Sequence, residues 1–374
     1  MLWILVILGA TLFVAYANGA NDNFKGVATL FGSGVVDYRK ALWWATATTL
    51  AGSLTAFFVA TKLISNFQAN GLVPAALAQS QPFVAAVILG AALTVYLATT
   101  IGIPISTTHS LTGAMVGSGF AALGLELGFG TLLKSFFIPL LFSPLIAVAL
   151  AVVAYPLLSK AFRVAGLRRE NCVCVGSELV PVSVTAEGYA MPQSSGLRVL
   201  IDRESECVQR LSGTMFGVNA QSVLDVGHYL SAGALSFARG LNDTPKIVAL
   251  GLAASALNLG WSIGLVAFIM ALGGLLSAKK VAEMVSKRIT AMNPDQGFVA
   301  NLVTSFLVIF ASKWGLPVST THISCGALFG IGMANGQARS SVIRTILLAW
   351  ILTLPIAGMT AAVIYWMLMA VSIS

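Results

Sequence analysis

Two polar motifs occur twice in this sequence, and their side chains are suited to binding ions. Residues 19–28 (GANDNFKGVA) match residues 240–249 (GLNDTPKIVA) at six of ten positions. Residues 102–117 match residues 315–330 at nine of sixteen positions, and both segments contain the run Ser-Thr-Thr-His. Because the two motifs come in the same order in each half of the chain, we infer an internal duplication.

The first motif places an amide and a carboxylate inside an apolar region of each half: Asn21 and Asp22, then Asn242 and Asp243. A charge at the centre of a membrane costs about 2.5–3.5 kcal/mol on insertion scales, so it needs a partner or a function. Each aspartate either caps a helix, pairs with the lysine three residues on, or binds a cation. Sodium prefers hard oxygen ligands, which broken helices supply, so we predict a sodium site formed by these residues.

The second motif places three successive hydroxyl groups after a Gly-x-Pro-x sequence and before a short apolar stretch. The start of a helix presents unpaired N–H groups and a partial positive charge, which attract anions. One triplet alone could be an ordinary helix cap, but two matched triplets can surround a tetrahedral oxyanion. The predicted anion ligands are Ser106, Thr107, Thr108, Ser319, Thr320 and Thr321.

Several further polar side chains are candidates for gating or coupling. His109 and His322 follow the triplets, either as proton relays or as ordinary residues at a helix start. Asp225 and His228 lie three residues apart on one helical face, either as a coupling element or as a buried structural pair, and the first half has no counterpart. The complete set of these candidates is Lys25, Lys246, His109, His322, Asp225 and His228.

The composition indicates which elements carry these motifs. Of the 374 residues, 57% are hydrophobic and 9% are charged, whereas an ordinary soluble domain is about 25% charged. This excludes a soluble enzyme and predicts an all-α polytopic membrane protein. The stretches that cross or nearly cross the bilayer are residues 2–18, 41–61, 82–101, 131–157, 222–238, 259–277, 296–312 and 342–371. The first of these lacks a basic segment before it, so we interpret it as a retained span rather than a signal peptide.

Four apolar pieces are too short to span the bilayer comfortably, and each follows a Gly, Pro, Ser, Thr or Asn-rich break. They are residues 24–36, 108–124, 244–257 and 322–335. This pattern predicts broken helices and re-entrant hairpins.

The loop charges predict how the two halves are oriented. Arg39 and Lys40 lie between spans of the first half, while the matching loop of the second half is uncharged. The loop at residues 62–80 carries one lysine, while its match carries Lys279, Lys280, Lys287 and Arg288. Because basic loops remain in the cytoplasm, matching loops face opposite sides and the repeats have inverted topology.

A polar segment divides the chain into a first repeat (1–157), a small cytoplasmic insert (158–215) and a second repeat (216–374). Basic residues at its start place the insert in the cytoplasm and both termini outside. The insert contains β-favouring pieces at residues 172–175 and 197–201 and three of the four cysteines, whose spacing fits no zinc or redox motif. The basic residues behind the net charge of +8 sit in short loops between apolar stretches, as cytoplasmic loops do, which argues against nucleic-acid binding.

With two Gly-x-Asn-Asp and two Ser-Thr-Thr-His motifs, the sequence resembles the inorganic phosphate transporter (PiT) family. The resemblance implies phosphate import by symport with sodium, or with protons in some bacterial members, through alternating access around one midplane site. It implies phosphate at the hydroxyl triplets, sodium at the Asn-Asp pairs and no cofactor. The family includes proton-coupled sulfate permeases. A protonated phosphate oxygen can donate a hydrogen bond to Asp22 or Asp243, which favours phosphate over sulfate.

The resemblance also implies an integral protein of the prokaryotic plasma (inner) membrane and, by analogy, a homodimer. Two other classes of function could use the same polar residues. An intramembrane hydrolase using Ser106, His109 and Asp22 needs one asymmetric nucleophile–base pair, whereas every polar motif here is duplicated. An anion channel would conduct only down a gradient. The sequence therefore favours a transporter and not an enzyme.

Overall fold

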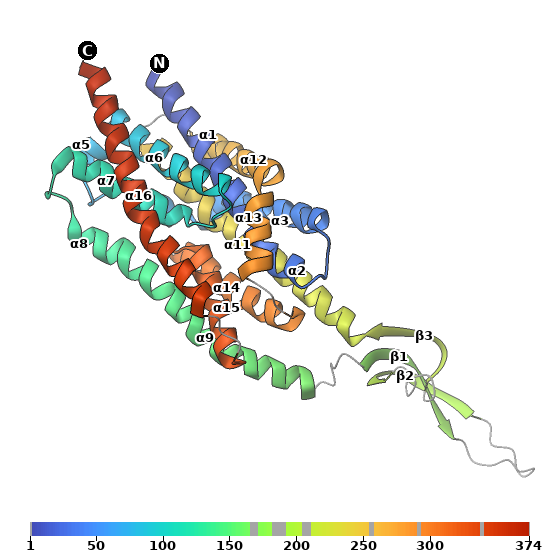
Figure 1. Ribbon diagram of the computed structural model, residues 1–374. Helices are drawn as coiled ribbons and strands as arrows, with labels where there is room; N and C mark the ends of the chain where they lie inside the picture. Colours follow the sequence, from blue (N-terminus) through green and yellow to red (C-terminus); the bar gives the residue numbers. More distant parts are fainter. Residues whose placement is uncertain are drawn as a thin grey trace, which may run out of the picture.

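The computed structural model is an elongated bundle of helices with a small β-sheet projecting from one end (Figure 1). It describes residues 2–164, 171–181, 192–203, 211–253, 258–289, 293–336 and 340–373. Within these ranges, seven helices are long and apolar enough to cross a membrane. The two ends of the chain lie at the end of the bundle opposite the sheet. The prediction of an all-α polytopic membrane protein is confirmed.

The first repeat contains three long helices, two hairpin helices and several short turns of helix. Its elements are α1 (Leu2–Asp22), the 3₁₀ segment η1 (Asn23–Val27), α2 (Ala28–Gly32), α3 (Tyr38–Val59), α4 (Thr61–Asn66), α5 (Ala75–Ala78), α6 (Gln81–Thr100), α7 (Thr107–Leu123), α8 (Phe129–Thr131), the π-helical η2 (Leu132–Phe137) and α9 (Ile138–Val164). The hairpin is formed by α6 and α7, which are joined by residues 101–106.

The second repeat has the same order of long elements. They are α11 (Ala220–Ala253), α12 (Leu259–Ser277), α13 (Lys279–Glu283), the π-helical η3 (Met284–Ile289), α14 (Pro294–Trp314), α15 (Thr320–Ala334) and α16 (Ser340–Ile373). Here α14 and α15 form the hairpin, and residues 315–319 join them.

The segment between the repeats forms an antiparallel sheet with strand order β2-β1-β3. Its strands are β1 (Asn171–Pro181), β2 (Pro192–Arg203) and β3 (Leu211–Asn219). The β-favouring pieces noted in the sequence fall in β1 and β2. Since α9 continues to Val164 and α11 begins at Ala220, the observed elements end a few residues away from 157 and 215. The division into three domains stays a prediction.

Matching helices of the two repeats run in opposite directions. Helix α1 begins at the end that holds the chain termini, whereas α11 begins beside the sheet (Figure 1). Likewise α9 ends beside the sheet, whereas α16 ends at the opposite end. The predicted inverted topology of the repeats is therefore present in the fold.

The two repeats are interleaved and do not form two separate bundles. Helix α1 packs against α12, and its counterpart α11 packs against α3. Both crossings depend on glycine at the start of the first motif. A Cβ atom added to Gly19 would lie 1.9 Å from the carbonyl oxygen of Met270, and one added to Gly240 would lie 2.1 Å from that of Thr49. The helices can approach this closely only because neither glycine has a side chain.

The last helix of each repeat packs on the hairpin of the other. Helix α16 lies against α7, and α9 lies against α15. Each hairpin is thereby held between elements of both repeats. Its tip is fixed at the centre of the bundle.

The predicted helix break is present in one repeat and absent from the other. After Asp22 the chain turns into the 3₁₀ segment η1, as expected for a broken helix. Helix α11, in contrast, continues through Asn242 and Asp243 to Ala253 with Pro245 in its interior. The expectation of a break at residues 242–244 is therefore wrong. A proline can be held inside a helix that neighbours pack around, and α11 packs against α3, α12 and α14.

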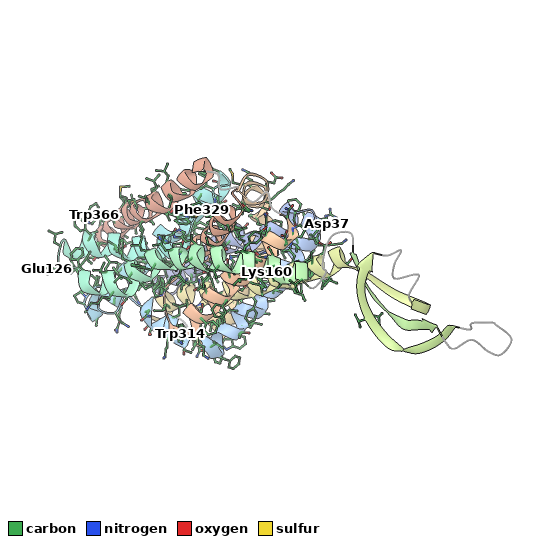
Figure 2. The ribbon with its side chains drawn as sticks, turned by 90° about the horizontal axis from the view of Figure 1, so that it is seen from below. Asp37, Glu126, Lys160, Trp314, Phe329 and Trp366 are labelled. Atoms are coloured by element: carbon green, nitrogen blue, oxygen red, sulfur yellow. The ribbon has the colours of Figure 1, made fainter. Side chains whose placement is uncertain are left out.

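Residues near the ends of the helices mark the two ends of the bundle. Asp37 and Lys160 lie toward the sheet, whereas Glu126 and Trp366 lie at the opposite end (Figure 2). Asp37 caps α3 by accepting a hydrogen bond from the backbone N–H of Lys40 at 2.9 Å. That hydrogen bond lowers the pKa of the Asp37 carboxyl below its usual value. Arg39 and Lys40 follow directly, so this basic loop is on the same side as the sheet.

Candidate functional site

The tips of the two hairpins meet at the centre of the bundle and bond to each other. The hydroxyl of Thr108 donates to the carbonyl oxygen of Val318 at 3.1 Å. The hydroxyl of Thr321 donates to the carbonyl oxygen of Ile105 at 3.4 Å. Val318 matches Ile105, and Thr321 matches Thr108, at the same offset of 213 residues. These two hydrogen bonds are therefore related by the internal repeat.

The two aspartates of the first motif belong to one site. Asp22 and Asp243 are both buried, with 2% and 3% of their surface exposed. The amide of Asn18 donates to the Oδ2 atoms of both, at 3.0 Å and 3.4 Å. Thr107 also donates to Asp22, at 3.1 Å. A single side chain thus bridges carboxylates that come from different repeats.

Lys25 is buried next to Asp22 and donates to oxygen atoms from both repeats. Its Nζ atom bonds to the Asp22 carboxylate, to Asn21 Oδ1 at 2.9 Å, to the Ile105 carbonyl at 2.6 Å and to Thr321 Oγ1 at 3.1 Å. These partners include a carboxylate, an amide, a backbone carbonyl and a hydroxyl.

Lys246 occupies the matching position in the second repeat. Its Nζ atom donates to Thr108 Oγ1 and to the Val318 carbonyl, both at 2.7 Å, and lies 3.6 Å from Asp243 Oδ1. Each lysine therefore joins the aspartate of its own repeat to the hairpin hydroxyl of the other repeat.

The donor set at each predicted sodium position is chemically suitable but is already bonded. Asn21 Oδ1 accepts from Lys25 and from the backbone N–H of Ile105. Asn242 Oδ1 accepts from Ser312 at 3.2 Å, and its amide donates to Asp243 Oδ1. In this arrangement the residues do not fit an additional cation.

Arg239 is a buried member of the site that the sequence reasoning missed. Only 1% of its surface is exposed, and its Nη2 atom lies 3.8 Å from Oδ2 of both Asp22 and Asp243. No hydrogen bond within the described structure satisfies its three nitrogen atoms. It matches Asn18 at the offset of the first motif. It lies one residue before the repeated motif, at a position where the two halves carry different residues.

The serines and histidines of the hairpins have structural roles in this arrangement. Ser106 and Ser319 are the N-caps of α7 and α15, and each accepts a hydrogen bond at 3.2 Å from the backbone N–H of the following histidine. The rings of His109 and His322 have centroids 4.0 Å apart, which places the repeat-related pair side by side. Of the predicted anion ligands, Thr107, Thr108 and Thr321 are hydrogen-bonded to the charged groups.

A small cavity reaches the site from the side of the sheet. It has a volume of about 40 Å³, and both Lys25 and Thr321 line it. Helix α1 runs toward the sheet, so residues that follow Lys25, such as Thr29, lie on that side. His228 donates to or accepts from Thr29 at 3.0 Å, which places it beside this cavity rather than at the carboxylates. Asp225 lies one turn earlier on the same helix.

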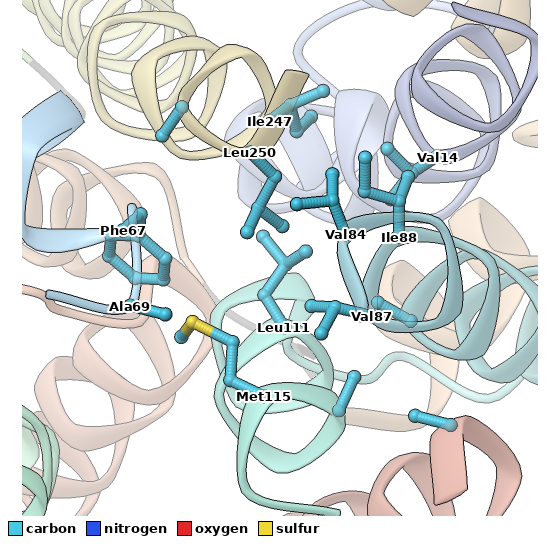
Figure 3. Close-up of a cluster of buried hydrophobic side chains, with 14 of the residues drawn as sticks. Val14, Phe67, Ala69, Val84, Val87, Ile88, Leu111, Met115, Ile247 and Leu250 are labelled. Carbon is cyan, nitrogen blue, oxygen red and sulfur yellow. The ribbon is translucent and has the colours of Figure 1, made fainter. Parts of the chain in front are cut away.

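Toward the end of the bundle that holds the chain termini, α6 and α7 contribute side chains to a buried apolar cluster (Figure 3). It includes Val87, Ile88, Leu111, Met115 and Leu250, and we call these five residues the apolar plug. Phe67, in the same cluster, has its ring centroid 5.8 Å from the Lys246 ammonium.

The residues that match the apolar plug in the other repeat line the cavity. They are Ala300, Asn301, Ser324, Leu328 and Thr29, in the same order. Four of the five are smaller or more polar than their counterparts. The two sides of the site are thus related by the repeat but differ in side-chain size and in access.

Comparison with known proteins identifies the architecture in which this site occurs. Residues 18–361 match a model of the phosphate transporter family. The chain belongs to the phosphate transporter family. The match includes both copies of each polar motif, the lysines, Arg239 and the two hairpins. Members of this family are transporters rather than enzymes, so the hydrolase alternative is excluded.

Relatives of this family member cover almost its whole length. It is 26% identical over 402 residues to a protein of Pyrococcus abyssi inferred to be a phosphate permease, with 97% of each chain covered. It is also 26% identical over 416 residues to the chloroplastic inorganic phosphate transporter 2-1 of Arabidopsis thaliana, with 94% of this chain and 70% of the other covered.

A solved structure shares the fold of this family member. That structure, of a sodium-dependent phosphate transporter, superposes with a TM-score of 0.73 at 20% sequence identity. The alignment covers 99% of this chain and 100% of the other. At this identity the similarity establishes the fold alone.

Proposed function

We propose that the chain imports inorganic phosphate as a secondary active transporter, with alternating access to one site between the two repeats. Family membership supports phosphate as the substrate. The buried lysines and Arg239, together with the threonine hydroxyls at the hairpin tips, can donate hydrogen bonds to the phosphate oxygens. A protonated phosphate oxygen can in turn donate to Asp22 or Asp243, which a fully ionised sulfate cannot do.

The difference between the two sides of the site is the observation that carries alternating access. The apolar plug closes one side, while the matching residues of the other repeat line a cavity. The repeats also differ in backbone conformation, since η1 interrupts the first and α11 is continuous. If the two inverted repeats exchange conformations, the closed side opens and the open side closes. A continuous channel would need both sides open at once.

The orientation of the protein in the membrane follows from the positions of the basic loops. Lys160 and Asp37, which directly precedes the basic segment of Arg39 and Lys40, lie toward the end that carries the sheet. Basic loops remain in the cytoplasm. We infer a prokaryotic plasma membrane, with the sheet inside, the termini outside and the cavity facing inward. A homodimer is proposed from the family resemblance.

The coupled ion is one of the two cations that the sequence predicts, sodium or the proton. A sodium-dependent relative of the same fold supports sodium. The bonded state of the predicted sodium ligands supports the proton-coupled alternative. A transport experiment should therefore impose a sodium gradient and a proton gradient separately.

Uptake of radiolabelled phosphate into proteoliposomes tests the proposal. We expect accumulation above the external concentration when a cation gradient is imposed, and weak competition by sulfate. The variant Asp22→Asn removes a central charge and should abolish uptake, whereas the exposed Asp37→Asn should transport normally. Accumulation that never exceeds the external concentration would indicate a channel. Full activity of Asp22→Asn would contradict the assignment of the site.

A further inference from the structure

Three buried cationic side chains surround the two carboxylates at the centre of the protein. Lys25 bonds to Asp22, Lys246 lies 3.6 Å from Asp243, and Arg239 lies 3.8 Å from both aspartates. All five side chains are less than 10% exposed. With every group in its ordinary charge state, the site carries one net positive charge before any substrate or ion binds.

The two lysines use the oxygen atoms that a pair of sodium ions would need. Lys25 Nζ donates hydrogen bonds to a carboxylate, an amide, a carbonyl and a hydroxyl oxygen. Lys246 Nζ donates hydrogen bonds to the repeat-related hydroxyl and carbonyl oxygens and lies beside the repeat-related carboxylate. Hard oxygen atoms of these kinds are the usual ligands of sodium in broken-helix transporters. A cation is therefore already present at each position, and it is attached to the chain.

Arg239 adds a third positive charge that the repeat does not duplicate. The matching residue of the first repeat is the neutral Asn18. The Arg239 nitrogen atoms make no hydrogen bond within the described structure, although the side chain is buried. A guanidinium group binds tetrahedral oxyanions through two parallel hydrogen bonds. Arg239 is thus positioned to receive the anion.

We propose that this protein binds and transports phosphate without sodium, because Lys25 and Lys246 take the positions of the coupled sodium ions and Arg239 balances the charge of the anion. This inference rests on the proposed phosphate transport. A site with only carboxylates would need mobile cations in order to accept an anion in a low-dielectric interior. Here the cations belong to the chain, so the anion needs no sodium partner.

Phosphate uptake in the absence of sodium tests this directly. Proteoliposomes with the same inward proton gradient are placed in choline chloride or in sodium chloride of equal ionic strength. We expect initial rates that agree within about twofold, since an ion that is not coupled does not change the affinity for the substrate. Uptake that is lost in choline and restored by sodium would overturn the inference while supporting the proposed function.

A lack of uptake in both media would count against the proposed function and would not test the role of sodium. Equilibrium binding then tests the inference separately. Binding of radiolabelled phosphate to the purified protein is measured in choline and in sodium medium. A coupled ion changes affinity by about 5- to 150-fold, whereas we expect a ratio close to one. An increase in phosphate affinity with sodium in that range would overturn the inference.

Lysine variants test the role of the attached cations. We expect Lys25→Ala to bind phosphate at least about tenfold more weakly in choline, and to recover part of the affinity when sodium enters the vacated position. Lys246→Ala provides an independent second case. Lys313→Ala, at an exposed position at the end of α14, is the matched control. Unchanged, sodium-insensitive binding by both site variants would overturn the assignment.

Discussion

At the scale of single residues, Arg239 is the side chain on which substrate affinity should depend most. It is buried, its nitrogen atoms have no hydrogen bond within the described structure, and it lies 3.8 Å from a carboxylate of each repeat. A hydrogen bond to a charged group contributes about 1.5–3 kcal/mol. We therefore expect Arg239→Gln to weaken phosphate binding by about ten- to a hundredfold.

Two comparisons separate this role from a structural one. Arg239→Lys keeps the charge but loses the paired donors, so its phosphate affinity should fall between those of the wild type and Arg239→Gln. Arg39→Gln changes an exposed arginine and should bind phosphate normally. Equal affinity of the folded Arg239→Gln variant and the wild type, measured by equilibrium binding, would contradict the role.

Much of the site is visible in the sequence because its residues are duplicated. The Asn-Asp pairs and the Ser-Thr-Thr triplets could be found by alignment of the two halves, and the structure brings members of both together. The spacing of Asp22 and Lys25 also suggested their pairing as an alternative. The contacts of Lys25 with Ile105 and Thr321 could not be predicted, because they join residues that are distant in sequence. Arg239 has no duplicate, so a search for repeated polar residues overlooks it.

At the scale of helices, the close crossing of α1 and α12 holds the first motif in place. A valine at Gly19 would bring its Cβ to 1.9 Å from the Met270 carbonyl oxygen, which is backbone and cannot move aside without separating the helices. We expect Gly19→Val to destabilise the protein by at least about 1–3 kcal/mol, as overpacking does. The midpoint of thermal unfolding, followed by size-exclusion chromatography in detergent, measures the effect.

The matched control lies in the same helix. Within the described structure, no other element comes within 4 Å of a Cβ added at Gly9, so Gly9→Val should unfold at the wild-type temperature. A Gly19→Val protein that is as stable as Gly9→Val would show that the helices do not cross as closely as described.

The apolar plug should control access from the side opposite the sheet. Leu111→Ser combined with Leu250→Thr gives the plug the residues found at the matching positions beside the cavity. Burial of apolar surface stabilises the state that is closed on this side by about 0.8 kcal/mol per methylene, so removing it makes that state less stable. We expect preloaded proteoliposomes carrying the double variant to lose phosphate several-fold faster than wild type. Leu141→Ser, at an exposed position on α9, should not change the rate. Identical efflux from all three would contradict the gating role.

At the scale of the whole molecule, the fold is two inverted repeats that exchange helices. The inverted topology could be predicted from the loop charges, since basic residues alternate between matching loops. The packing of α16 on α7 and of α9 on α15 could not, because apolar helices carry no pairing signal in their sequence. The continuity of α11 through Pro245 was also missed, since its packing overrides the local preference for a break. The continuous α11 and the interrupted helix of the first repeat give the two repeats different conformations, which the proposed alternating access requires.

Locating a bound anion tests the central claim most directly. Arsenate has the shape and charge of phosphate, and arsenic scatters X-rays anomalously, so a crystal soaked in arsenate reveals the position of the ion. We predict an anomalous peak between the hairpin tips, within hydrogen-bonding distance of Arg239 and beside Thr107 and Thr320. A peak at any other place, with none at the centre, would contradict the site on which this account of transport depends.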